Sequence, residues 1–254
     1  MSKKFNLLDT DKIREYYDTK IPSLEKGYFA YRWEASPLRR EHYHQTHMSL
    51  MQELANKDFD CVVEVGTGPC VWTKFLSMRS KLLAGVDISL EMLKGCSSDD
   101  NVALLCCANA YQLPIKSEII NALFSIRALE YFPDKAKAVK EFYRVLQPGG
   151  YLLIITKNRN YGGYRSPNRE LNNRFSRKMA LHMGNVSPEY LASLIQQQGF
   201  SQVRIKPAIV GRTNFLPIWK VIRLLRRWFT PQWSEGIPRI MDRATESFMV
   251  TAYK

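Results

Sequence analysis

Short apolar runs alternate with helical segments along most of this chain. Strands that are apolar throughout and are joined through helices are typical of a parallel sheet with both faces covered. The expected strands are residues 61–65, 81–87, 101–107, 118–126, 151–157, 201–210 and 246–253, and the expected helices are residues 10–20, 37–56, 71–78 and 134–147, with another beginning at Ser89. The pattern predicts a doubly wound α/β fold, in which ligands bind at the carboxyl ends of the strands.

Length and composition indicate the domain organisation. With 254 residues, 45% of them hydrophobic, the chain can bury one sizeable core. We predict a single domain over residues 1–254, made of a helical cover (1–56), a cofactor-binding core (57–157) and a region with a substrate-side loop, a lid helix and the final strands (158–254). No apolar run of about 18 or more residues predicts a membrane span, and no secretory signal is recognised, so we expect a cytoplasmic protein.

The cysteines give a further indication of the compartment. Five cysteines lie at positions 61, 70, 96, 106 and 107, an odd number without a Cys-x-x-Cys pair. Three of them fall in expected strands. The pattern favours reduced thiols over disulfides or a zinc site.

The net charge of +13 is unevenly distributed. Residues 157–254 hold 17 Lys and Arg against 5 Asp and Glu, so this part alone carries a net charge of +12. A basic region indicates an anionic partner, which can be nucleic acid, a membrane surface or an acidic small substrate. A basic surface that only faces solvent is the alternative.

Two basic stretches carry much of this charge. Residues 214–229 place apolar side chains on one helical face and four basic side chains on the other. Such a helix can lie on an anionic membrane surface, cover a pocket or meet a partner, and the sequence leaves these three readings open. Residues 157–178 mix basic side chains with Gly, Asn and Ser, which is typical of a loop that sets substrate specificity.

The segment Glu64-Val65-Gly66-Thr67-Gly68 joins a strand to a helix and indicates a ligand close to the backbone. A dinucleotide site needs Gly-x-Gly-x-x-Gly, but Val71 stands in place of the third glycine and Pro69 removes a backbone donor. Both changes argue against a bound pyrophosphate and still admit an adenosyl or amino-acid group. Asp87 ends the next expected strand and can accept bonds from both ribose hydroxyls.

Several segments resemble, in the same order, the class I S-adenosyl-L-methionine (SAM) dependent methyltransferases of the type 11, quinone-biosynthesis-like subgroup. They are residues 64–68, 86–92, 107–134, 144–155 and 187–205. The resemblance covers roughly residues 55–205 and implies a mostly parallel seven-stranded, Rossmann-like methyltransferase fold with SAM as cofactor. It implies transfer of a methyl group to a small-molecule acceptor, amphipathic or anionic, by direct in-line displacement.

Two other functions remain open, an RNA methyltransferase and a SAM-binding interaction protein without catalysis. No RNA-binding module is recognised beside the core. The segment after the fourth expected strand reads Ser125-Ile126-Arg127-Ala128 instead of Asn-Pro-Pro-Tyr, the motif that holds planar amino groups. Nucleic acid is therefore not the expected partner.

The resemblance also implies the cofactor-binding residues. The glycine turn would place the methionine part of SAM on the backbone, Asp87 would hold the ribose, and Ile88 would pack on the adenine. Asn109 stands where the subgroup usually has Asp. The full set expected to bind the cofactor is Glu64, Gly66, Thr67, Gly68, Asp87, Ile88, Met92, Asn109, Ala110 and Arg127.

The catalytic candidates are His47, at helical spacing on the apolar face of residues 37–56, and Tyr131, after the fourth expected strand. His47 can equally be a packed core histidine. It lies near His42 and His44, but no cysteine or carboxylate completes a tetrahedral set, so we expect no metal. Tyr28 and Tyr31, in an aromatic stretch over residues 25–33, are further candidates to line the site.

Overall fold

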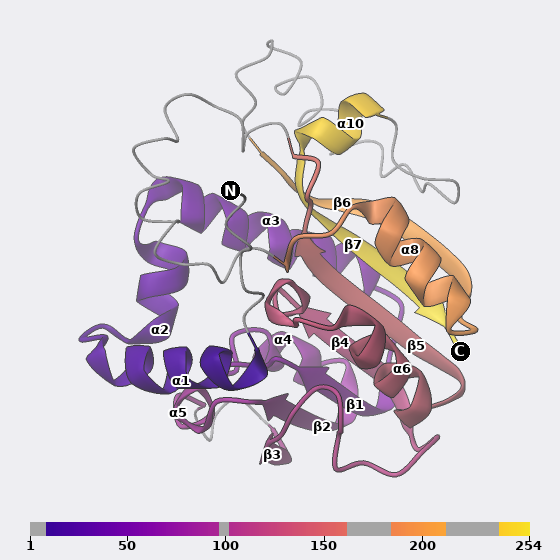
Figure 1. Cartoon of the computed structure of the whole chain (residues 1–254), viewed down its shortest axis with the longest axis horizontal. Coiled ribbons are helices and arrows are strands. Elements are labelled where there is room, and N and C mark those ends of the chain that lie inside the picture. Colours follow the sequence, from indigo (N-terminus) through magenta and orange to yellow (C-terminus); the bar gives the residue numbers. More distant parts are fainter. Residues whose placement is uncertain (1–8, 97–101, 162–183, 212–238) are drawn as a thin grey trace, which may run out of the picture.

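The computed structural model describes residues 9–96, 102–161, 184–211 and 239–254 (Figure 1). The strands are β1 (Phe59–Val65), β2 (Ser80–Asp87), β3 (Leu104–Cys107), β4 (Ile120–Ile126), β5 (Leu146–Lys157), β6 (Ser201–Val210) and β7 (Thr245–Tyr253). The helices are α1 (Thr10–Lys20), α2 (Gly27–Phe29), α3 (Pro37–Glu53), α4 (Thr73–Ser77), α5 (Leu90–Leu93), α6 (Lys135–Val145), α8 (Pro188–Gln197) and α10 (Arg239–Ala244), with shorter helical turns η1 (Ile21–Ser23), η2 (Ala30–Glu34) and η4 (Leu129–Tyr131).

The strands pair into one seven-stranded sheet in the order β3-β2-β1-β4-β5-β7-β6. Strands β1 to β5 run parallel, and β7 lies antiparallel between β5 and β6. The strand order changes direction between β1 and β4, and the carboxyl ends of strands at such a switch point are where open α/β sheets bind ligands. The predicted mostly parallel seven-stranded sheet is confirmed.

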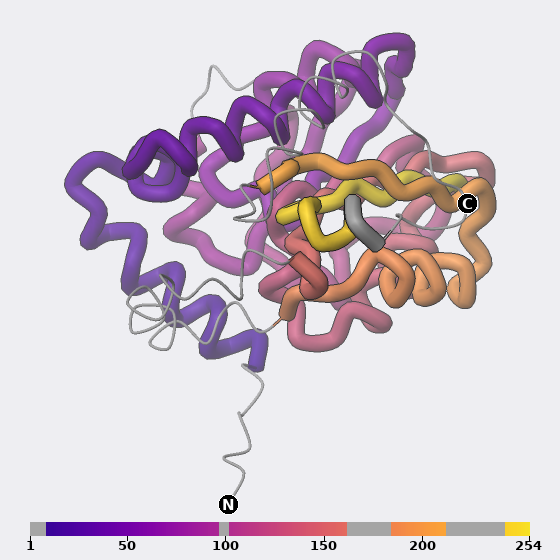
Figure 2. Tube along the Cα trace, turned by 90° about the horizontal axis from the view of Figure 1, so that it is seen from above, coloured from indigo at the N-terminus to yellow at the C-terminus, as the bar shows by residue number. Residues whose placement is uncertain are grey.

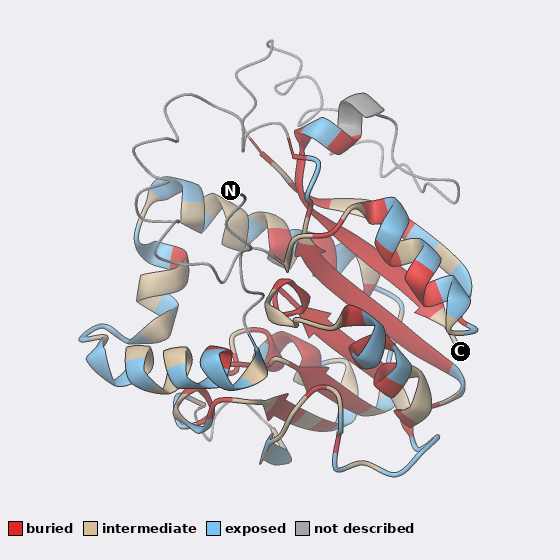
Figure 3. Ribbon diagram, viewed as in Figure 1, coloured by how far each residue is buried: buried red, intermediate tan, exposed pale blue. Residues whose placement is uncertain are grey.

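Helices cover both faces of this sheet, as the view along the layers shows (Figure 2). Helices α3 and α4 pack on one face, where Leu50 and Leu76 are buried against strand side chains. Helices α6 and α8 pack on the other face through Phe142, Leu191 and their neighbours. Full burial of one such side chain stabilises the fold by about 1.5–3 kcal/mol. The central strands are buried along most of their length (Figure 3), which explains why their sequences are apolar throughout.

Side-chain caps fix where several helices begin. The Ser89 Oγ atom accepts a hydrogen bond from the backbone amide of Met92 at 3.2 Å, so Ser89 is the predicted N-cap of α5. Asp9, Ser36 and Asp134 accept equivalent bonds at the starts of α1, α3 and α6. Each cap satisfies one of the amide groups that have no partner inside their helix.

One predicted boundary is wrong. Residues 134–147 were expected to be helical and the strand was expected to begin at 151, but α6 ends at Val145 and β5 begins at Leu146. Leu146 pairs with Ile120 and Tyr151 pairs with Ala122, so the register shifts between these pairs and β5 holds the extra residues. The Pro148-Gly149-Gly150 segment lies in this irregular part of β5. Gly149 adopts φ +75° there, a conformation that glycine allows.

The expectation that all cysteines are reduced is also wrong. Cys70 and Cys96 form a disulfide, with their Cα atoms 5.1 Å apart. They are 26 residues apart in sequence, but one follows the glycine turn after β1 and the other follows α5, and both sites lie at the same edge of the sheet. Cys61, Cys106 and Cys107 are free thiols; the first two are half-buried and the third is exposed.

The basic helix predicted over residues 214–229, and the loop predicted over 157–178 apart from residues 157–161, lie outside the described residues. Within the ranges that the structure does describe, no helix has the length and apolar character needed to cross a membrane.

Candidate active site

A cavity lies at the carboxyl ends of β1, β2 and β4, below the N-terminal helices. Its wall contains most of the residues predicted from the sequence: Gly66, Thr67, Gly68, Asp87, Ile88, Met92, Asn109, Ala110, Arg127 and Tyr131. Tyr28 also lines it, whereas three predicted residues, Glu64, His47 and Tyr31, do not. The structure therefore brings residues from five separate segments of the chain to one cavity.

The turn after β1 forms one side of this cavity. Gly66 and Gly68 have φ values of +79° and +56°, a conformation that side chains with a Cβ disfavour. A Cβ on Gly66 would lie 2.2 Å from the Cβ of Ala128, so only glycine fits there. A Cβ on Gly68 would meet only the Met92 Cε atom, at 3.4 Å, because the rest of its surroundings is open. The turn thus presents bare backbone to the cavity.

Asp87 fastens this turn to the end of β2. Its Oδ2 atom accepts a hydrogen bond from the Gly68 amide at 2.9 Å, and its Oδ1 atom accepts one from the Ser89 amide at 2.9 Å. Burial raises the pKa of this carboxyl, and the hydrogen bonds from Ser89 and Gly68 oppose that shift. A carboxylate oxygen can accept more than one bond, so Asp87 can also receive hydroxyl donors from a ligand.

Glu64 lies under the turn, outside the cavity wall. Its side chain is fully buried; Oε2 accepts a hydrogen bond from the Thr67 hydroxyl at 2.9 Å, and Oε1 has no partner. Burial raises the pKa of Glu64 to about 8, so the carboxyl is largely protonated at neutral pH. In this arrangement Glu64 supports the turn from below through Thr67.

Asn109 lines the cavity and also closes a turn of the backbone. Its Oδ1 atom accepts a hydrogen bond from the Tyr111 amide at 3.0 Å and so closes a local turn. The neighbouring Ala108, Ala110 and Ile88 give this part of the cavity an apolar wall.

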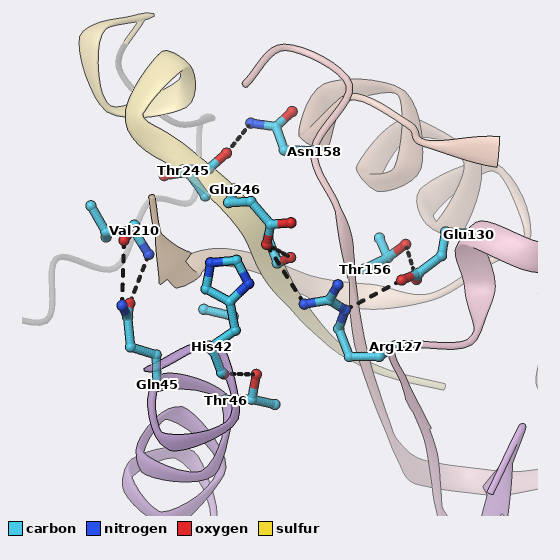
Figure 4. A network of polar contacts seen from close by, with 12 residues as sticks. His42, Gln45, Thr46, Arg127, Glu130, Thr156, Asn158, Val210, Thr245 and Glu246 are labelled. Carbon is cyan, nitrogen blue, oxygen red and sulfur yellow. Dashed lines mark hydrogen bonds and ion pairs between the residues drawn. The ribbon is translucent and has the colours of Figure 1, made fainter. Parts of the chain in front are cut away.

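Arg127 is held at the cavity wall by a buried network of charges (Figure 4). It has φ +60°; its Nε atom lies 3.3 Å from Glu130 Oε1, and its Nη1 atom lies 3.6 Å from Glu246 Oε2. The other Glu130 oxygen accepts a hydrogen bond from the Thr156 hydroxyl at 3.0 Å. Glu130 comes from the turn after β4, Thr156 from β5 and Glu246 from β7, so three neighbouring segments position one guanidinium.

The network shifts the pKa of each nearby ionisable group in a definite direction. Burial would raise the pKa of Glu246, but Arg127, Lys157 and His42 outweigh it and lower that pKa to about 2. Burial lowers the pKa of Lys157 to about 8 and that of His42 to about 4. At neutral pH His42 is therefore neutral, and Glu246 is ionised.

His42 and His47 have different surroundings in the structure. His42 points towards Glu246 (Figure 4). His47 instead lies parallel to the ring of Tyr43, at 6.3 Å between ring centroids, and meets Phe75 edge-on. Among the described residues no group of three His, Cys, Asp or Glu side chains is placed to hold a metal ion.

Tyrosines from the helical cover and from η4 form another part of the cavity wall. Tyr17 lies 5.8 Å from Tyr131 and 6.4 Å from Tyr28 between ring centroids, and the hydroxyls of Tyr17 and Tyr131 are hydrogen-bonded to each other. Burial raises the pKa of all three hydroxyls, so they remain protonated donors at neutral pH. Sequence reasoning singled out Tyr28 and Tyr131 but missed Tyr17, because nothing in its helical context distinguishes it from a packing residue.

Comparison with known proteins agrees with this geometry. Residues 63–154 match the family model described as a methyltransferase domain. This segment is a class I SAM-dependent methyltransferase domain. Its match to the model begins in β1 and ends in β5, and it includes the glycine turn, Asp87 and Arg127.

Curated relatives of this methyltransferase domain act on different acceptors. A malonyl-[acyl-carrier protein] O-methyltransferase of Marinomonas sp. is 32% identical over 112 residues, which are 42% of this chain and 42% of the relative. A demethylmenaquinone methyltransferase of Corynebacterium kroppenstedtii is 33% identical over 103 residues, 41% of this chain and 44% of the relative. The chain thus matches less than half the length of either relative.

Solved structures share the fold over a longer span. A SAM-dependent methyltransferase from Thermotoga maritima aligns with a TM-score of 0.66 at 18% identity, over 95% of this chain and 99% of the other. Phosphoethanolamine N-methyltransferase 2 of Haemonchus contortus, solved with SAM, aligns with a TM-score of 0.63 at 19% identity, over 95% of this chain and 59% of the other. At these identities the likeness shows the fold.

SAM is the cofactor of this class of methyltransferase domain, and the residues present fit it. The bare backbone at Gly68 leaves room for a ligand against the turn. Asp87 places a half-buried carboxylate in the same wall, and the apolar surface beside Ile88 suits a flat ring. These features together match the methionine, ribose and adenine parts of one molecule.

Proposed function

We propose that this chain methylates a small-molecule acceptor, with SAM as the methyl donor, by direct in-line displacement. The observation that carries the proposal is the shared cavity, which is lined by the glycine turn and Asp87 together with Tyr17, Tyr28 and Tyr131. When bound, SAM supplies a methyl group already activated by its sulfonium. The protein then has to hold the acceptor in line with that methyl group and exclude water.

The proposed roles of the cofactor residues follow from their positions. Gly66, Thr67 and Gly68 receive the amino-acid part, and Asp87 accepts the ribose hydroxyls. Ile88, Met92, Asn109 and Ala110 enclose the adenine, Glu64 supports the turn, and Arg127 closes the wall at the end of β4. Removal of the Asp87 carboxylate should leave ribose hydroxyls without a partner, which costs roughly 1.5–3 kcal/mol for bonds to a charged group.

Tyr131 is the proposed catalytic residue. Its hydroxyl lines the cavity and stays protonated at neutral pH, because burial raises its pKa. It therefore orients an acceptor by donating a hydrogen bond, and does not act as the base. His47, the other candidate, packs on Tyr43 and Phe75 away from the wall, so we propose a packing role for it.

The acceptor class is supported by relatives named malonyl-[acyl-carrier protein] O-methyltransferase and ubiquinone biosynthesis O-methyltransferase. We further propose that the chain works as one unit, in which residues 1–56 cover the SAM-binding core at 57–157 and residues 158–254 face the acceptor. The charge of residues 157–254 supports a peripheral contact with an anionic membrane surface. Cytoplasmic localisation stays a prediction.

Turnover with radiolabelled SAM and a panel of small acids, phenols and amines tests the proposal. We expect a labelled product from the wild type and a greatly reduced yield from Tyr131→Phe. Asp87→Ala should weaken cofactor binding and lower the yield of product together. If the wild type binds SAM but labels no acceptor in the presence of extracts rich in small molecules, the chain is a SAM-binding protein without this activity. Labelling of RNA, lost at high salt, would favour the alternative acceptor.

A further inference from the structure

Two arginines line the cavity, and the structure neutralises only one of them. Arg127 faces the carboxylates of Glu130 and Glu246. Arg32, from the turn η2, forms no hydrogen bond or ion pair with a carboxylate among the residues that the structure describes. Its guanidinium lies over the ring of Trp33, 4.3 Å from the ring centroid, and that contact does not balance its charge.

The local backbone places Arg32 at the cavity. Residues Ala30–Glu34 form a π-helical turn between α2 and α3, and such turns are rare and frequently occur at functional sites. The turn directs both Arg32 and the adjacent Trp33 to the wall. Trp33 is buried, and Arg127 also lies near its ring, at 5.8 Å from the centroid, so the two guanidinium groups share one indole.

The carboxylates near Arg32 are engaged by other donors. Arg32, Arg127 and Lys157 are the cations of this region at neutral pH, because His42 is neutral. Its carboxylates are Glu130 and Glu246, which face Arg127, and Asp87, which accepts the backbone amides of Gly68 and Ser89. Arg32 also lies close enough to act electrostatically on the hydroxyls of Tyr17, Tyr28 and Tyr131. A partly enclosed cation beside hydroxyl donors has the chemistry of an anion site.

We propose that Arg32, with the tyrosine hydroxyls beside it, is a carboxylate-binding subsite of the cavity. The planar guanidinium presents paired N–H donors that match the two oxygens of a carboxylate. This inference rests on the proposed function. The carboxylate is either the one on the amino-acid end of the cofactor or one carried by the acceptor, and the two sources differ in which ligand loses affinity when Arg32 changes.

The test compares Arg32→Gln with a control, Arg40→Gln. Arg40 is an exposed residue of α3 whose side chain donates a hydrogen bond to the Glu34 carbonyl. Calorimetry measures the affinity of each variant and of the wild type for S-adenosylhomocysteine and for its decarboxylated analogue. If the cofactor supplies the carboxylate, Arg32→Gln should weaken binding of S-adenosylhomocysteine by roughly tenfold or more and leave the decarboxylated analogue unchanged. Arg40→Gln should change neither.

The acceptor arm uses thermal shift with S-adenosylhomocysteine already bound. If an acceptor supplies the carboxylate, benzoate should stabilise the wild type more than benzamide does, and Arg32→Gln should lose that difference while keeping its affinity for S-adenosylhomocysteine. Arg32→Lys keeps the charge without the paired donors, so it should recover part of either effect.

The two hypotheses fail in different ways. Wild type that does not bind S-adenosylhomocysteine at all refutes the proposed function, and this subsite with it. Wild type that binds, together with a folded Arg32→Gln that matches the wild type in both arms, overturns the carboxylate subsite alone. If Arg32→Gln has a much lower melting temperature than the wild type, Arg32→Lys replaces it in both measurements. A lysine variant that equals the wild type in both would contradict recognition of the carboxylate by paired N–H donors.

Discussion

The carboxylate of Asp18 accepts a hydrogen bond from the Ser89 hydroxyl at 2.6 Å, across 71 residues of sequence. Asp18 belongs to α1 and Ser89 caps α5, so this bond joins the helical cover to the segment that follows Asp87. The Glu91 amide adds a longer bond to the same oxygen, at 3.4 Å. The cover is therefore fixed to the wall that we assign to the cofactor.

Asp18→Ala should loosen the cover without unfolding the sheet. The Ser89 hydroxyl can still cap α5, but the bond between α1 and α5 is lost, and we expect the affinity for S-adenosylhomocysteine to fall by roughly tenfold. Calorimetry measures the affinity, and hydrogen exchange over residues 9–20 measures the loosening. Asp11→Ala, which removes an exposed partner of Arg14, is the matched control. Equal exchange in both variants would contradict the role of Asp18.

Asp87→Ala should weaken SAM binding far more than it weakens the fold. The variant loses the acceptor for the Gly68 amide and the proposed acceptor for the ribose, at a cost of roughly 1.5–3 kcal/mol in binding. Asp60 is an exposed acid of β1 that pairs with Lys81, and the control variant Asp60→Ala should bind SAM with the affinity of the wild type. Unchanged affinity in Asp87→Ala would remove Asp87 from the site.

Glu64→Gln should change how stability depends on pH. The pKa of Glu64 in the folded chain is about 8, raised from 4.5, so its contribution to stability is fully present below about pH 4.5 and is lost as pH rises towards 8. Glutamine cannot ionise. As pH rises through this window, the stability of the variant relative to the wild type should therefore increase by at most about 1.4 kcal/mol per pH unit. Melting temperatures measured from pH 5 to 8 check this. A constant difference between the two proteins over that range would show that Glu64 has an ordinary pKa.

Reduction of the Cys70–Cys96 disulfide should destabilise the chain and loosen the glycine turn. The bond closes a loop that contains β2 and Asp87, and loss of a crosslink of this span costs about 2–4 kcal/mol. A phosphine reductant should therefore lower the melting temperature of the wild type and have no further effect on Cys70→Ser. Cys107→Ser, at an exposed free thiol, should behave like the wild type. Identical melting with and without reductant would contradict the disulfide.

The sequence predicts the features that depend on local pattern. The β1, β2 and β4 runs are apolar because both faces of the sheet are covered, and Gly66 and Gly68 are required by the backbone itself. Asp87 could be predicted for the same reason, since it ends a strand next to that turn. These positions are set by the residue and its immediate neighbours.

What depends on distant parts of the chain could not be predicted. The partners of Arg127 come from η4 and β7, and nothing near residue 127 indicates Glu246. The disulfide joins two cysteines with no recognisable spacing, and the role of Arg32 depends on a π-helical turn that local propensity does not encode. His47 matched the apolar periodicity of α3, but only the packing against Tyr43 and Phe75 shows that it lies away from the cavity.

The position of β7 has a consequence for how the chain is made. β7 pairs with β5 along one edge and with β6 along the other, so β6 reaches the rest of the sheet only through it. During synthesis β6 and α8 leave the ribosome before β7 exists, and β5 meanwhile exposes an open edge that other chains can pair with. The five parallel strands can assemble early, with the cofactor wall among them. The order in which the strands are synthesised therefore differs from their order in the sheet at this edge. The sheet is complete only after Thr245–Tyr253 have been synthesised and have paired with β5 and β6.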